Sequence, residues 1–181
     1  SLKNLLSHLP DKPRDDIYDT LRCKILDQLG EISEGEEWRG YCEQLKELCD
    51  NRLNKVKKSD LHLKNLYSHY MGSAYSGLGS CNYENGDIIL AIEQWQRGLN
   101  YYEDAKDTIG IATIVNNLGV SYMGLGELDK SLEFFNKSYK LAQKDGSKAD
   151  LAQIVNNIGF IYMKKNLLDT ALRYYKKSQA L

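Results

Sequence analysis

Residues 114–141 read IVNNLGVSYMGLGELDKSLEFFNKSYKL, and residues 154–181 read IVNNIGFIYMKKNLLDTALRYYKKSQAL. The two stretches align without a gap at an offset of 40 residues, and 13 of the 28 positions are identical. Similarity at a fixed offset is typical of a chain that stacks the same small structural unit several times. We therefore predict a repeat protein.

Each copy contains two runs of apolar residues at helical spacing. In the first copy the runs cover residues 114–124 and 128–141, and a Gly-Leu-Gly sequence at 124–126 separates them. Glycine supplies the positive φ at which many helices end, so each copy is predicted to be a helix, a tight turn and a second helix. Gly119 and Gly159 recur inside the first helix, where glycine costs about 1 kcal/mol relative to alanine. Close approach to an aromatic residue of the second helix explains both glycines.

A weaker copy precedes these two. Residues 71–75 match residues 118–122 at an offset of 47, whereas residues 86–95 match residues 126–135 at an offset of 40. The difference places an insertion of seven residues near Gly79-Ser-Cys-Asn-Tyr-Glu-Asn-Gly86. Because this stretch is rich in Gly, Ser and Asn, it is predicted to be a loop.

The composition favours an all-α chain that carries no general attraction for polyanions. The only prolines are Pro10 and Pro13, 42% of the residues are hydrophobic, and the net charge is −1. We expect no nucleic-acid binding by this segment, and no apolar run is long enough to span a membrane. Residues 146–181 are basic, with six basic against two acidic side chains. That basic end is either a solvated face or a surface for an acidic partner.

The residues that usually carry chemistry form no set that is typical of a catalytic or metal site. The four cysteines lack C-x-x-C spacing, and the three histidines complete no ligand pattern. Buried free thiols are expected, with a bridge between Cys23 and Cys42 as the alternative. We expect no metal, no cofactor and no enzymatic activity.

The first 60 residues are less regular. A short helix is predicted over residues 2–9, before the prolines. One apolar stripe then consists of Ile17, Leu21, Ile25, Leu26 and Leu29. A second stripe consists of Trp38, Tyr41, Cys42, Leu45, Leu48, Cys49 and Leu53. The two stripes predict a degenerate helical hairpin that caps the repeats.

The repeated pattern resembles the tetratricopeptide repeat, whose signature combines Leu-Gly-x-x-Tyr on the first helix with a small residue, an aromatic residue and another small residue on the second. One copy of that signature is Val115, Leu118, Gly119, Tyr122, Ser131, Phe135 and Ser138. The next copy is Val155, Ile158, Gly159, Tyr162, Ala171, Tyr175 and Ser178. The resemblance covers residues 62–181, although the period is 40 and the usual proline after the second helix is absent. It implies an all-α, right-handed superhelical solenoid of antiparallel helix pairs.

The predicted organisation is an N-terminal region, residues 1–60, followed by three repeats at about 62–106, 107–146 and 147–181. The last repeat has no polar capping helix after it, so we expect a fragment of a longer protein. The first helices of the repeats would line a concave groove. By the resemblance, the groove residues are Leu66, His69, Tyr70, Ser73, Ser76, Thr113, Asn116, Asn117, Val120, Met123, Gln153, Asn156, Asn157, Phe160, Met163 and Lys164.

The paired asparagines, Asn116 with Asn117 and Asn156 with Asn157, need a physical reason. Asparagine is a poor residue inside a helix, but its amide both donates and accepts hydrogen bonds. The amides either hold the backbone of an extended peptide or bond a neighbouring repeat and stiffen the stack. Lys164 is the only basic groove residue, which argues against a clamp for a C-terminal carboxylate.

We therefore expect a non-catalytic module that binds a protein or peptide in its groove. Self-association is the alternative. The chain also resembles, more loosely, the input regions of bacterial two-component kinases and related transcription regulators, especially from Bacteroidetes. That resemblance implies a place in a larger signalling protein. The cytoplasm is the favoured compartment, and the periplasm would require an upstream signal that has been removed.

Overall fold

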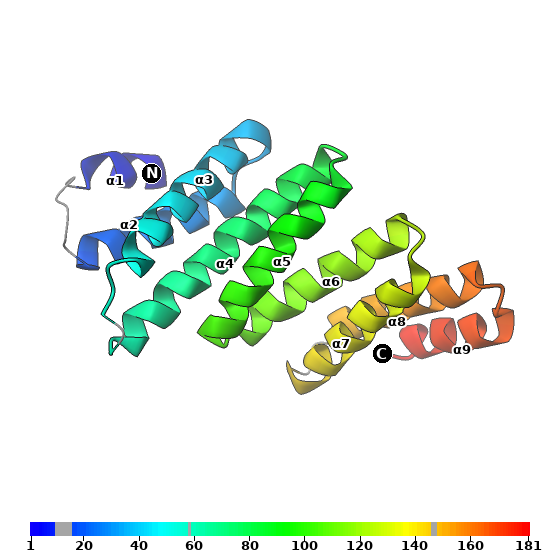
Figure 1. Cartoon of the computed structure of the whole chain (residues 1–181). Helices are drawn as coiled ribbons and strands as arrows, with labels where there is room; N and C mark the ends of the chain where they lie inside the picture. Colours follow the sequence, from blue (N-terminus) through cyan, green and yellow to red (C-terminus); the bar gives the residue numbers. More distant parts are fainter. Residues whose placement is uncertain (10–15, 58, 146–147) are drawn as a thin grey trace. The chain divides into compact units, whose positions relative to one another are not determined.

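The computed structural model describes residues 1–9, 16–57, 59–145 and 148–181, and these residues form nine helices and no strand (Figure 1). The helices are α1 (Leu2–His8), α2 (Asp16–Glu31), α3 (Gly35–Leu53), α4 (Leu61–Glu84), α5 (Ile88–Ala105), α6 (Thr108–Gly124), α7 (Leu128–Asp145), α8 (Lys148–Lys164) and α9 (Leu168–Gln179). The chain divides into two compact units, Ser1–Gly110 and Ile111–Leu181. The all-α prediction is confirmed. Among the described helices, none is long and apolar enough to cross a membrane.

The N-terminal unit is built around α4, which packs against α2, α3 and α5. Its core joins one face of α4, with Tyr67 and Met71 fully buried, to Leu26 of α2 and to Leu45 of α3. The short helix α1 adds Leu6 to the edge of this core. Helices α2 and α3 pack against each other and against α4.

Two aromatic residues of α5 lie against glycines of α4. A Cβ added at Gly72 would come within 2.6 Å of the Tyr102 ring. The Trp95 ring occupies the equivalent space at Gly79, and Nε1 of Trp95 donates to the Ser76 carbonyl oxygen at 3.0 Å. Glycine at these positions therefore sets how closely α4 and α5 approach.

The predicted loop over residues 79–86 is wrong, because α4 continues as a helix to Glu84. Tertiary contacts account for the difference. Gly79 lies beneath Trp95, Cys81 and Asn82 are buried, and the Asn82 side chain accepts a hydrogen bond from Nη2 of Arg39 at 3.0 Å. The insertion thus lengthens α4, and the turn is confined to the residues around Gly86, whose φ is +86°.

The predicted apolar stripe on α2 is correct only in its second half. Ile25, Leu26 and Leu29 are buried, but Ile17 is 74% exposed and Leu21 is 43% exposed. At this end of the helix the buried face instead carries Asp19, which forms an ion pair with Arg52 of α3. Asp19 thus holds the buried position at this end of α2, and Ile17 and Leu21 lie at the surface.

The four cysteines are free and buried, as predicted. The alternative bridge between Cys23 and Cys42 is not formed. The Sγ atoms of Cys23 and Cys49 lie 3.7 Å apart inside the α2–α3 interface. The hydrogen bond with the Cys23 thiol and, second, burial raise the pKa of Cys49.

The C-terminal unit repeats one packing arrangement twice. Phe135 of α7 is fully buried and lies against Gly119 of α6, and Tyr175 of α9 lies against Gly159 of α8. The predicted close approach at both glycines is confirmed. A serine hydroxyl on the second helix also donates to a backbone oxygen of the first helix, as Ser131 does to Gly119 at 2.6 Å.

The turns inside the three repeats share one left-handed residue at a spacing of 40. Gly86 has a φ of +86°, Gly126 has a φ of +77°, and Asn166 has a φ of +60°. Asparagine tolerates this region better than most residues with a Cβ. The equivalence explains how the last repeat keeps its turn without the Gly-Leu-Gly sequence of the preceding repeat.

Candidate functional site

His69, a predicted groove residue on α4, is held by the turn before α6. Its Nδ1 lies 2.6 Å from Oδ2 of Asp107. The other carboxylate oxygen of Asp107 accepts the backbone N–H groups of Ile109 at 3.1 Å and Gly110 at 3.0 Å. Asp107 therefore caps α6 with one oxygen and orients His69 with the other.

Tyr70, the next predicted groove residue, is half-buried against the core of the N-terminal unit. Burial raises the pKa of its phenol to about 12, with Asp27 as the largest charge contribution. The ring also lies edge-on to His69, with centroids 5.1 Å apart. Tyr70 thus contributes to packing as well as to the surface of α4.

Ser73, one turn further along α4, donates a hydrogen bond from its hydroxyl to Oδ1 of Asp27 on α2. This contact marks one wall of a partly open cavity of about 160 Å³ between α2, α3 and α4. The cavity is comparable in volume to an engineered cavity that binds benzene in another protein. It is therefore large enough for a small ligand or one side chain of a partner.

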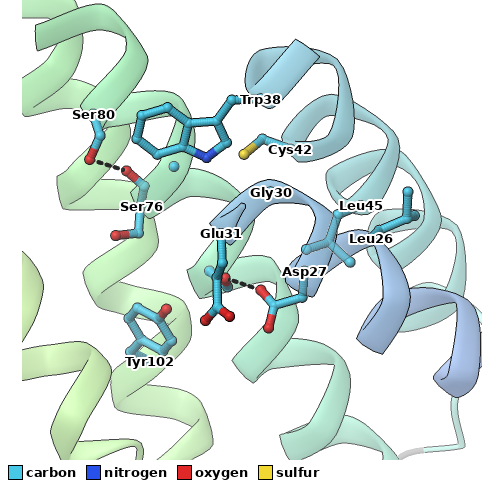
Figure 2. A pocket seen from close by; sticks show the side chains of 12 residues that line it. Leu26, Asp27, Gly30, Glu31, Trp38, Cys42, Leu45, Ser76, Ser80 and Tyr102 are labelled. Atoms are coloured by element: carbon cyan, nitrogen blue, oxygen red, sulfur yellow. Dashed lines mark hydrogen bonds between the residues drawn. The ribbon is translucent and has the colours of Figure 1, made fainter. Parts of the chain in front are cut away.

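The lining of this cavity combines carboxylates, hydroxyls and aromatic rings. Helix α2 contributes Asp27 and Glu31, α3 contributes Trp38 and Cys42, and α5 contributes Tyr102. Figure 2 shows the two carboxylates projecting from the same side of α2, with Tyr102 across from Glu31. Ser73, Ser76 and Ser80 of α4 complete the polar wall.

The charge inside the cavity is negative and uncompensated by any residue that lines it. Asp27 accepts from Ser73, and Glu31 is exposed and pairs with no cation in the part of the chain that the structure describes. No lysine, arginine or histidine is among the described lining residues. Burial raises the pKa of Tyr102, and it raises the pKa of the Cys42 thiol to about 12, so both groups stay neutral at physiological pH.

In the C-terminal unit, Asn117 of α6 and Asn157 of α8 occupy equivalent, half-buried positions. Neither amide makes a hydrogen bond to another residue of the described ranges. Oδ1 of Asn116 is buried and likewise accepts no hydrogen bond from the described residues. Asn156 is exposed. Within the described residues of the C-terminal unit, no hydrogen bond links these amides to a neighbouring helix pair.

The other predicted groove residues of this unit divide into exposed and packed positions. Thr113 and Gln153 are exposed, whereas Val120 and Met123 pack against the core of the unit. Phe160 is half-buried, and the Lys164 ammonium lies 5.2 Å from the centroid of its ring. The exposed and half-buried members leave a largely polar surface on α6 and α8.

Of the cavity residues, the sequence predicts Ser73 and Ser76 as groove residues. Trp38 and Cys42 were predicted only as an apolar stripe, and Asp27 and Glu31 were not singled out. The spacing of those two acids is four residues on a predicted helix, which places them on one face. That spacing is the one signal that could have suggested a shared site.

Comparison with known families places part of the chain in one of them. A family model described as tetratricopeptide repeat matches residues 70–144 and, overlapping them, residues 110–181. Together the two matches cover residues 70–181, which is more than half of the chain. No curated protein matches the sequence.

Several solved structures share the fold. Aspartyl phosphate phosphatase F from Bacillus subtilis superposes with a TM-score of 0.76 at 15% identity, over 99% of this chain and 44% of that one. BtubC (BKLC) from P. vanneervenii superposes with a TM-score of 0.70 at 17% identity, over 99% of this chain and 69% of that one. The apo form of RapI gives a TM-score of 0.69 at 14% identity, over 98% of this chain and 45% of that one. The chain thus spans less than half the length of two of these proteins.

Proposed function

Because the chain belongs to the tetratricopeptide repeat family, we propose that it is a non-catalytic protein-interaction module that holds a peptide segment of a partner protein. The proposed binding surface is the polar face of α6 and α8 in the C-terminal unit. The observation that carries the proposal is the pair of equivalent amides, Asn117 and Asn157, which are half-buried and make no hydrogen bond to other described residues. Such amides can donate to and accept from a peptide backbone without reading its side chains.

The helical-repeat fold is that of an interaction scaffold, and we further propose that the scaffold serves a signalling protein. Two observations support this part of the proposal. One is the looser resemblance to bacterial input regions, and the other is the fold shared with an aspartyl phosphate phosphatase. The output activity of such a protein would come from another segment.

A selection of random peptides tests the proposed surface. Peptides enriched on the protein are compared for binding to the Asn117→Ala/Asn157→Ala variant and to Asn136→Ala, which removes an exposed asparagine on α7 of the same unit. Each amide contributes about 1 kcal/mol, so the double variant should bind about thirtyfold more weakly. The control should bind normally, and both variants should keep their helical circular dichroism. Equal binding by the double variant would remove the proposed surface.

Self-association remains a second candidate, favoured by the last helix. Leu168 and Leu172 of α9 are 61% and 52% exposed. Their equivalents 40 residues earlier, Leu128 and Leu132 of α7, pack against the core of the unit. Sedimentation over a micromolar concentration series measures whether a second copy covers this face. A monomer throughout the series argues against self-association.

A further inference from the structure

We propose that the cavity between α2, α3 and α4 takes the guanidinium group of an arginine side chain presented by a partner peptide. This inference rests on the proposed function as a peptide-binding module. It adds a second, charge-selective site in the N-terminal unit. The juxtaposition that carries it is a pair of carboxylates, three serine hydroxyls and two aromatic rings around one partly open space (Figure 2).

The size of the space restricts what can enter. A volume of about 160 Å³ exceeds the roughly 30 Å³ that one water occupies in the liquid, yet it is too small for a segment of main chain. The lining comes from three helices and from Tyr102 of α5. One extended side chain that enters from the open side is therefore the occupant that fits best.

The charge of the lining selects a cation. Asp27 and Glu31 lie one helical turn apart on α2, and no basic residue among the described lining neutralises them. Arg39 of α3 is not a lining residue, and its guanidinium donates to Oδ1 of Asn82 at 3.0 Å. Two carboxylates beside low-dielectric walls create a negative potential that is less screened than on an open surface. A neutral or anionic side chain would leave this potential uncompensated.

The hydrogen-bonding groups and rings favour guanidinium over ammonium. Guanidinium is planar and offers five donors, which suits two carboxylates and the oxygens of Ser76 and Ser80. Its face also stacks on aromatic rings, and Trp38 and Tyr102 both line the space. A lysine ammonium would satisfy the charge but leave more of the oxygen acceptors without a donor.

The test uses two blocked amino acids as probes, N-acetyl-arginine amide and N-acetyl-citrulline amide, which have nearly the same shape and differ in charge. Each is titrated into the millimolar range while the indole N–H signal of Trp38 is followed by two-dimensional NMR. A Trp95→Phe variant assigns that signal. We expect the arginine probe to shift the Trp38 signal saturably, and we expect the citrulline probe to bind at least about tenfold more weakly.

Matched variants locate the binding. Glu31→Gln removes one charge from the cavity, whereas Glu93→Gln removes one charge from an exposed position on α5 that does not line it. We expect the first to weaken the arginine probe about tenfold and the second to leave it unchanged. Equal binding of arginine and citrulline, an equal loss in both variants, or no shift of the Trp38 signal would each overturn the proposal.

The same experiment separates this inference from the proposed function. The probes contain no peptide beyond their blocking groups, so their binding does not depend on Asn117 or Asn157. If the arginine probe fails to bind while selected peptides still depend on those amides, only the cavity proposal is wrong. If the probe binds and no peptide depends on the amides, only the proposed surface on α6 and α8 is wrong.

Discussion

Replacing Gly72 with alanine should destabilise the N-terminal unit, although alanine is the better helix former. In an open helix interior the exchange stabilises by about 1 kcal/mol. At Gly72 the new Cβ would lie 2.6 to 2.8 Å from three atoms of the Tyr102 ring. Such contacts require the ring to move.

The ring has little room to move, because it is also close to Gly110. A Cβ built at Gly110 would lie 2.5 to 2.6 Å from the same ring. Overpacking in a core costs about 1–3 kcal/mol, and a ring held at two positions belongs near the upper end. Subtracting the gain in helix propensity leaves a net loss of about 2 kcal/mol.

The matched control is Gly40→Ala, which lies in the interior of α3 in the same unit. A Cβ at Gly40 meets nothing within 4 Å, so the variant should gain about 1 kcal/mol. Urea titration followed by circular dichroism measures both. With a slope of about 2 kcal/mol per molar, the midpoint should fall by about 1 M for Gly72→Ala and rise by about 0.5 M for Gly40→Ala.

A double variant tests the cause. In a Tyr102→Leu background the smaller side chain removes the contact, so adding Gly72→Ala should no longer destabilise. The reasoning is refuted if Gly72→Ala is as stable as Gly40→Ala, or if its cost persists in the leucine background.

Three further predictions concern buried polar groups. Arg52→Met removes the ion-pair partner of Asp19, whose side chain is only 8% exposed. The free energy of unfolding, measured by urea titration, should fall by about 3–5 kcal/mol, because an unpaired carboxylate would remain buried. A loss below about 1 kcal/mol would contradict a buried ion pair. Burial raises the pKa of Tyr67 to about 12, so the folded state keeps a proton that the unfolded chain releases near pH 10. The stabilising contribution of Tyr67 is therefore present below pH 10 and lost as the pH rises toward 12. In Tyr67→Phe, the urea midpoint should fall less steeply with pH over that range. An unchanged dependence of the midpoint on pH would argue against this contribution. Burial likewise raises the pKa of Cys42 to about 12. In a variant that keeps only this cysteine, a disulfide reagent at pH 8 should label the native protein at least about a hundredfold more slowly than the unfolded chain, because the thiolate is the reactive form. Rapid labelling of the native protein would contradict this prediction.

Much of the C-terminal unit could be predicted because its two helix pairs share one pattern. A glycine that recurs opposite a ring, as at Gly119 and Gly159, is a costly choice for a helix unless the partner helix is close. The structure places Phe135 and Tyr175 at those glycines. Because the same unfavourable glycine occurs in both copies, it predicts that the second helix packs closely at that position.

The insertion near residue 79 was mispredicted because its residues are poor helix formers taken by themselves. Its helical state depends on contacts with Trp95 and on the hydrogen bond from Arg39 to Asn82. Such contacts join residues that are far apart in the sequence, and they override local propensity. Similarly, nothing local predicts that Asp19 replaces an apolar residue on the buried face of α2.

The cavity escaped prediction for a different reason. Asp27, Glu31 and Trp38 lie in the first 60 residues, where no second copy shows which positions of a helix face its neighbours. A pair of acids on a helix is ordinarily a solvated face, and only the packing of α2 and α3 on α4 encloses them. The faces through which α2, α3 and α4 contact one another depend on the packing of the whole unit, so the sequence of each helix alone does not predict them.

The carboxylate of Asp107 determines where helix pairs can be added to or removed from this chain without loss of a contact. Whole repeats are gained and lost most easily at the turns between helix pairs, and the sequence places such a turn just after residue 106. A fragment that ends there would lose the partner of His69, and with it Gly110, which lies against Tyr102. A fragment that ends at residue 110 keeps both. The first turn of α6 therefore completes the unit that precedes it, so a duplication that inserts a new helix pair at residue 106 must supply its own acid and glycine at these two positions.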